Sequence, residues 1–190
     1  MSRAPRVGAP GDAREGLGMS EIDDVFNSLV GGLRDEGLGA EVAQRPDAPF
    51  FRDGERVEVR IHPEVSAVIS RLVREYAELL DDRTERLAML FPDAYEDSDE
   101  ENAAWALLNA DSMRAERQGR CETVLRGLND SWFPLVDADD WLRVFNDLRL
   151  VVVGREVSDE GLESLYKGDT PDGVVFILAS AVLQALLAVA

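Results

Sequence analysis

The chain has 190 residues, of which 45% are hydrophobic, and this is enough for one domain with a sizeable core. It carries 38 acidic and 20 basic side chains, so its formal net charge is −18. The acidity indicates either solubility alone or a surface that recruits a basic protein partner. Direct DNA binding is not expected, because counterion release needs clustered Lys and Arg. DNA binding would require that several basic residues lie together on one face, such as Arg71, Arg74, Arg114, Arg117 and Arg120.

The first 49 residues differ in composition from the rest. Residues 1–19 are rich in Gly, Pro, Ala and Arg and lack the apolar segment of a secretory signal, so a disordered tail is expected. Met19 is a second candidate for the translation start, beside Met1. Residues 20–49 are expected to form one helix followed by a linker rich in Gly, Ala, Pro and Asp.

Residues 50–61 predict a β-hairpin. Two short apolar runs flank Asp53-Gly54, a pair that favours a tight turn. Val57 and Val59 alternate with charged residues, so one face of the ribbon is apolar. Because an isolated two-stranded ribbon is only marginally stable, we expect this face to lie against helices.

Helical spacing of apolar residues continues through most of the remaining chain. It predicts helices at residues 63–80, 86–90, 99–128 (broken near Asn109), 137–154 and 174–190, with a short irregular or helical connection at 157–167. The predicted fold class is mostly α: a compact bundle of about five to six helices with one small N-terminal β-hairpin. Residues 50–190 are expected to form this single domain.

The central helix begins near Asp137 and ends at Gly154. Its apolar stripe consists of Trp141, Val144, Phe145, Leu148, Val151 and Val152. We expect this stripe to pack on the helix at 64–80 and on the C-terminal helix.

Two polar residues interrupt this pattern: Arg149 beside the apolar arc and Asn146 one helical step from it. In the structural interpretation Arg149 pairs with Glu75 or Glu78, because a half-buried arginine without a partner is costly, and Asn146 caps a nearby loop. In the functional alternative Arg149 lines a cleft for an anionic ligand. In the first interpretation Asn146, Arg149, Glu75 and Glu78 are buried polar residues with a structural role.

In the C-terminal segment, residues 174–190, only Ser180 and Gln184 are polar. Such a helix is either the buried core helix of a bundle or a membrane or dimer-interface helix. No basic cluster flanks it, which favours the core helix and no membrane association. A homodimer through this helix remains an alternative.

Few residues carry a recognisable chemical motif. His62 is the only histidine and has no nucleophile motif near it, so no catalytic residue is assigned. The acidic run at 96–101 lacks EF-hand spacing and is interpreted as a loop leading into a helix rather than a metal site. There is no P-loop and no dinucleotide fingerprint. We therefore expect no enzyme, no metal and no cofactor.

Cys121 is the only cysteine, which excludes an intramolecular disulfide and fits a reducing cytosol. It falls within an apolar helical arc, where cysteine usually behaves as a small buried hydrophobe. Arg117 and Arg120 lie nearby and would favour the thiolate if the sulfur were exposed, which makes Cys121 a redox candidate.

Several motifs occur in an order that resembles the actinobacterial oxidative-stress-responsive regulator family, formerly a domain of unknown function. They are the hairpin strand Arg56-Val57-Glu58-Val59, the helix end Leu79-Leu80-Asp81, the segment from Leu90 to Tyr95, and Trp141, Asn146-Asp147-Leu148-Arg149-Leu150 and Gly154-Arg155. The resemblance implies a cytoplasmic, non-enzymatic regulator that acts through protein contacts, with a sigma factor or RNA polymerase as partner. The alternative is an interaction scaffold or a small-ligand-binding helical domain with no redox role.

Family members described as oxidation sensors carry two cysteines separated by three residues. Here position 117 is Arg and position 125 is Leu, so Cys121 lacks a partner at that spacing. The sensing mechanism is therefore not carried over, unless Cys121 forms an intermolecular disulfide or a sulfenic acid.

Overall fold

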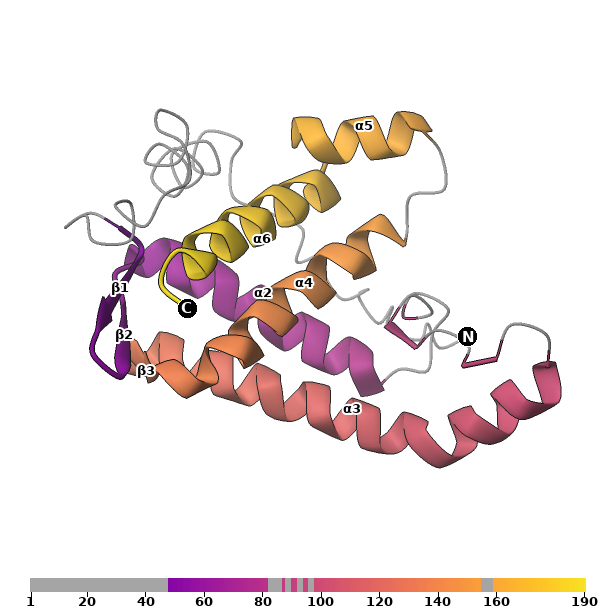
Figure 1. The fold of residues 1–190 in the computed structure, drawn as a ribbon. Coiled ribbons are helices and arrows are strands. Elements are labelled where there is room, and N and C mark those ends of the chain that lie inside the picture. The colour runs from indigo at the N-terminus through magenta and orange to yellow at the C-terminus, as the bar shows by residue number, and fades with distance from the viewer. Residues whose placement is uncertain (1–47, 82–86, 88–89, 92–93, 96–97, 155–158) are drawn as a thin grey trace, which may run out of the picture.

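The computed structural model describes residues 48–81, 98–154 and 159–190, together with Leu87, Leu90, Phe91, Ala94 and Tyr95. The tail, first helix and linker predicted within residues 1–47 lie outside this part. The described helices are α2 (Pro63–Asp81), α3 (Asp99–Asp130), α4 (Ala138–Val153), α5 (Asp159–Lys167) and α6 (Pro171–Leu187), with a 3-10 turn η3 at Leu135–Asp137 (Figure 1). The prediction of a mostly α fold is confirmed.

A small antiparallel sheet of order β1-β2-β3 lies at one end of the helices (Figure 1). The predicted hairpin is present as β1 (Phe50–Asp53) and β2 (Arg56–Val59), and Gly54 takes a φ of +60° in its two-residue turn. The third strand, β3 (Trp132–Pro134), was not predicted. It pairs Phe133 with Val57, and three residues are too few to show an alternating pattern.

Aromatic packing attaches the sheet to the start of α4. Trp141 is fully buried, with its ring stacked on that of Phe133 at a centroid distance of 4.4 Å and edge-on to that of Phe50 at 5.6 Å. Gly127 of α3 permits this approach, because a Cβ there would lie 2.7 Å from Trp141 Cζ2. The apolar face of the ribbon is thereby covered, as expected.

The apolar stripe predicted for the central helix is buried as a whole. The helix ends as predicted, with Gly154 at its C-cap. It packs chiefly on α6 and α3, and it reaches α2 through a hydrogen bond from Tyr76. α6 is the buried core helix of the two alternatives, since most of its side chains lie inside the protein.

The helix α3 is continuous over 32 residues, so the predicted break near Asn109 is wrong. The Asn109 amide donates to the carbonyl of Trp105 and the Ser112 hydroxyl donates to the carbonyl of Asn109, each at 2.9 Å. These local bonds satisfy the polar side chains within the helix instead of ending it. Only the C-terminal half carries buried residues, and the N-terminal half extends past the other helices (Figure 1).

Among the described residues no single helix is long and apolar enough to cross a membrane. Residues 161–167 and α6 meet that criterion of length and composition only as a pair, bent by 56°.

Candidate binding sites

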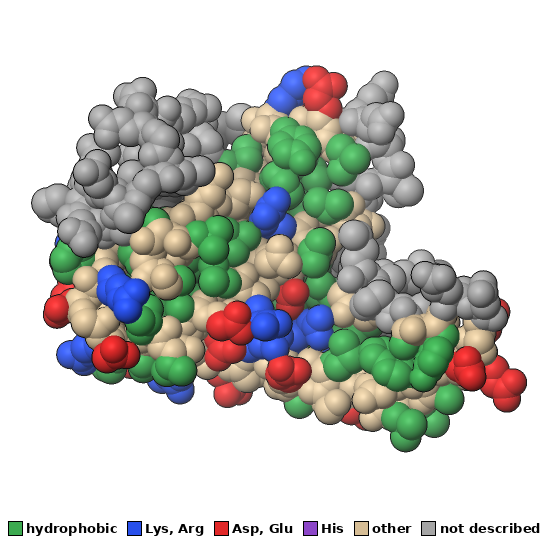
Figure 2. Space-filling view, in the orientation of Figure 1, with side chains coloured by type: hydrophobic (Ala, Val, Ile, Leu, Met, Phe, Trp, Pro, Cys, Tyr) green, Lys and Arg blue, Asp and Glu red, His purple; other side chains and the backbone are tan. Residues whose placement is uncertain are grey.

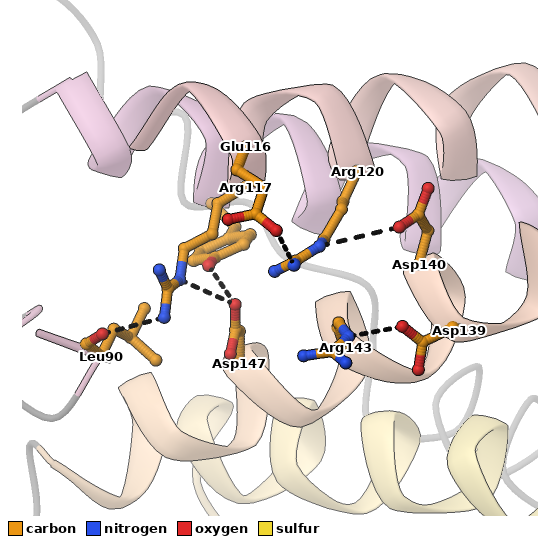
Figure 3. A network of polar contacts seen from close by, with 9 residues as sticks. Leu90, Glu116, Arg117, Arg120, Asp139, Asp140, Arg143 and Asp147 are labelled. Carbon is orange, nitrogen blue, oxygen red and sulfur yellow. Dashed lines mark hydrogen bonds and ion pairs between the residues drawn. The ribbon is translucent and has the colours of Figure 1, made fainter. Parts of the chain in front are cut away.

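A polar network built on Asp147 joins three helices. Asp147 is 9% exposed, and its Oδ2 accepts hydrogen bonds from the Tyr76 hydroxyl at 2.9 Å and from Arg117 Nε at 3.1 Å. Arg117 also donates to the carbonyl of Leu90 at 2.8 Å, and Figure 3 shows it lying between Leu90 and Asp147. The network therefore fastens α2, α3 and α4 to one another and to the segment at Leu90.

The two partners of Asp147 compensate its buried charge. Asp147 and Arg117 neutralise each other, and the Arg117 guanidinium lies 4.9 Å from the ring centre of Phe91. Burial and the negative charge of Asp147 raise the pKa of Tyr76, so its hydroxyl remains a protonated donor. These contacts give the network a structural role.

The predicted ion pair of Arg149 with Glu75 or Glu78 is wrong. Glu75 is exposed and lies 3.9 Å from Arg71 on its own helix, and Glu78 is exposed as well. Both face solvent, whereas Arg149 faces α6, where its guanidinium lies 5.0 Å from the ring centre of Phe176. The buried ion pair is instead the one between Asp147 and Arg117. Asp147 flanks the apolar stripe on the side opposite Arg149, and this position in the sequence indicates that its side chain is partly buried.

Arg149 consequently has no acidic partner among the described residues. Its side chain is half-buried, and its Nε is buried without a hydrogen-bond acceptor. Asn146, on the same helix, is exposed and makes no side-chain hydrogen bond to a loop among the described residues. Both residues line one groove.

This groove, which we call the α4–α6 groove, has a volume of about 770 Å³ and is open to solvent. Its polar lining consists of Arg117, Arg120, Arg143, Asn146, Asp147, Arg149, Ser180 and Gln184. Its apolar lining comes mainly from Leu142, Tyr166, Phe176, Ile177, Leu183 and Leu187. Helical spacing in the sequence distinguishes Asn146 and Arg149, but it does not show that residues of α5 and α6 line the same groove.

Two further arginines of the groove have acidic partners of their own. Arg120 pairs with Glu116 and lies 3.6 Å from Asp140, and Arg143 donates to Asp139 at 2.6 Å (Figure 3). Arg117 is held by Asp147. Among the four arginines that line the groove, Arg149 is therefore the one without a carboxylate in the described structure.

The redox candidate Cys121 is buried, at 1% exposure. Burial, and next the charge of Asp147, raise the pKa of its thiol to about 12. The thiol is accordingly protonated and inaccessible at neutral pH. This agrees with the interpretation of Cys121 as a small buried hydrophobe, because the redox interpretation required an exposed sulfur.

The N-terminal half of α3 presents an exposed apolar surface. Leu107 and Leu108 are 84% and 80% exposed, and Ala103, Ala104 and Ala106 beside them are exposed too; we call these five residues the α3 surface. Figure 2 shows hydrophobic side chains gathered over this end of the helix, with acidic side chains at its tip. The acidic residues of the first helical turn are Asp99, Glu100 and Glu101.

The residues considered for metal or catalytic chemistry do not converge in the described part of the chain. No group of three or more His, Cys, Asp or Glu side chains is placed there to hold a metal ion. His62 is exposed, with its Nδ1 4.0 Å from Glu64.

The fold and these sites define a mostly helical protein with an arginine-lined groove and an exposed apolar helix face. Residues 47–189 match the model of the family described as "Domain of unknown function (DUF2017)", and the chain belongs to that family. No curated protein and no solved structure matches the chain.

Proposed function

We propose that this protein is a non-enzymatic regulatory protein that binds a basic segment of a protein partner through the α3 surface. The observation that carries the proposal is the exposure of Leu107 and Leu108, two adjacent leucines on the half of α3 that none of the other described helices covers. Contiguous exposed apolar residues with a polar border commonly mark protein interaction sites.

The charge around the α3 surface selects the chemistry of the partner. Asp99, Glu100 and Glu101 border it at the helix N-terminus, within a chain of net charge −18. A basic amphipathic helix could pack its apolar face on the leucines and direct Lys or Arg toward these carboxylates. Electrostatic attraction of this kind speeds association and weakens as salt rises.

The resemblance to the oxidative-stress-responsive regulators supports a cytoplasmic role in stress-linked transcription, with a sigma factor or RNA polymerase as the partner. The ion pairs made by the arginines of α3 support a protein partner rather than DNA. Arg114, Arg117 and Arg120 each lie against a carboxylate and are not arrayed for phosphate contacts. Since Cys121 is buried, the proposal assigns it no part in sensing.

Affinity capture from a lysate of the native host tests the proposal. The wild-type chain should recover a sigma factor or RNA polymerase subunit, and the double variant Leu107→Asp/Leu108→Asp should lose it. Val136→Asp is the matched control, because Val136 is an equally exposed apolar residue (83%) on η3. Repeated recovery of no transcription component, or equal recovery by the wild type and the double variant, would contradict the proposal.

A homodimer through residues 174–190 is a separate proposal about assembly. Most large apolar side chains of α6 are already buried within the chain, and Leu187 is the one that is largely exposed, at 66%. Sedimentation of the wild type and of Leu187→Asp at two concentrations tests it, because only a dimer through this helix would be weakened by the substitution.

A further inference from the structure

We propose that the α4–α6 groove binds a small amphipathic carboxylate, meaning one carboxylate group on an apolar body. This site is lined by residues of α4, α5, α6 and the C-terminal half of α3, whereas the α3 surface lies on the N-terminal half of that helix. The inference does not depend on the proposed function. It rests on three features: the absence of a carboxylate partner for Arg149 in the part of the chain that the structure describes, the apolar walls of the groove and the volume of the groove.

Arg149 supplies the recognition of the anion. Its guanidinium is half-buried, lies over the ring of Phe176 and has no carboxylate within ion-pair distance among the described residues. A partly desolvated cation without a partner is unfavourable, and a bound carboxylate would supply that partner. The planar fork of a guanidinium matches the two oxygens of a carboxylate.

The surrounding charges favour one carboxylate over a polyanion. Arg117, Arg120 and Arg143 also line the groove, but Asp147, Glu116 and Asp139 respectively hold them. Among the described residues Arg149 is the one groove arginine without a carboxylate, and its single charge balances one carboxylate better than a doubly charged phosphate group. The side-chain amides of Asn146 and Gln184, both exposed at the groove, can add hydrogen bonds to a bound oxygen.

The walls of the groove fit an apolar body. Leu187 and Tyr166 stand in the groove at 66% and 72% exposure, and Leu142, Ile177 and Leu183 complete the apolar lining. Covering these side chains with a ligand removes apolar surface from water. The volume of about 770 Å³ falls within the range of roughly 300–1,000 Å³ found for small-molecule sites.

A titration of the ¹⁵N-labelled full chain followed by NMR tests the site with three probes. Octanoate carries both features, 1-octanol lacks the carboxylate and acetate lacks the apolar body. Octanoate should produce saturable shifts of the Arg149 Nε and Gln184 side-chain amide signals. 1-Octanol and acetate should bind at least tenfold more weakly.

Three variants locate the site. Arg149→Gln and Gln184→Glu should each weaken octanoate binding about tenfold or more, because the first removes the cation and the second adds a negative charge to the lining of the same groove. Arg74→Gln, at an exposed arginine of α2, should leave binding unchanged. Gln184 is exposed, so Gln184→Glu provides a folded test even if Arg149→Gln is unstable. Octanol binding as tight as octanoate, no saturable shift, or unchanged octanoate binding in Gln184→Glu would overturn the inference.

Discussion

The hydroxyl of Tyr76 on α2 donates a 2.9 Å hydrogen bond to Asp147 on α4, 71 residues further along the chain. Through the same carboxylate oxygen, Arg117 brings α3 into the contact. These helices therefore share a polar anchor inside an otherwise apolar core. The contribution of this polar contact to the free energy of unfolding can be measured, and so can that of Arg149, which has no carboxylate partner among the described residues.

The Tyr76 hydroxyl contributes a hydrogen bond to a buried charge. Tyr76→Phe should lower the free energy of unfolding by about 1.5–3 kcal/mol, the range for hydrogen bonds to charged groups. Tyr166→Phe is the matched control, because Tyr166 is 72% exposed and should change stability by less than about 0.5 kcal/mol. Urea unfolding of both variants measures the difference, and equal effects would show that the Tyr76 hydrogen bond is not stabilising.

Arg117 and Arg149 are both half-buried, but removal of their charge should affect stability to different extents. Arg117→Met leaves Asp147 without its cation and should cost about 3–5 kcal/mol. Arg149→Met removes a cation that has no acidic partner in the described structure, and it should cost less than about 1 kcal/mol or stabilise the fold. Denaturant unfolding checks both, and a large loss with Arg149→Met would mean that Arg149 has a structural partner.

Two glycines of α3 provide a test of the packing on Trp141. A Cβ at Gly127 would meet Trp141 Cζ2 at 2.7 Å, so Gly127→Ala should destabilise by about 1–3 kcal/mol through overpacking. Gly119 has nothing within 4 Å of its added Cβ, so Gly119→Ala should stabilise the helix by about 0.5–1 kcal/mol. Thermal unfolding followed by circular dichroism should therefore show shifts of opposite sign.

The buried thiol of Cys121 predicts a loss of stability at alkaline pH. The folded protein holds the proton up to a pKa of about 12, whereas the ordinary value is 9.0. Above pH 9 the unfolded chain then binds fewer protons than the folded one, so the free energy of unfolding falls as the pH rises toward 12. Cys121→Ala should show a smaller decrease between pH 9 and pH 11 in denaturant titrations. A parallel course for the two proteins would mean that the thiol does not titrate differently in the folded state.

Thiol labelling gives an independent measurement of the same burial. At pH 8 a disulfide reagent should label native Cys121 far more slowly than it labels the chain in denaturant, because the thiolate is both scarce and inaccessible. Rapid labelling of the native protein would restore Cys121 as a redox candidate.

The sequence by itself determined the helical class, the hairpin, the limits of the central helix and its buried stripe. Each depends on spacing along the chain: a period of 3.6 for the helices, a period of two for the strand at Val57 and Val59, and glycines at Gly54 and Gly154. The continuity of α3 across Asn109 was missed, because local hydrogen bonds by Asn109 and Ser112 satisfy side chains that often end helices.

Only the tertiary structure decided which polar residues meet. Asp147 and Arg149 border the same apolar stripe on opposite sides, and the sequence cannot tell which neighbouring helix each side faces. In the folded protein, α3 and α2 bring Arg117 and Tyr76 to Asp147, while α6 brings Phe176 and an open groove to Arg149. The ion pair of Asp147 joins two different helices, and the periodicity of one helix carries no information about which residue of another helix it contacts. Packing therefore separates the carboxylate of Asp147, which is paired, from the guanidinium of Arg149, which has no carboxylate partner among the described residues.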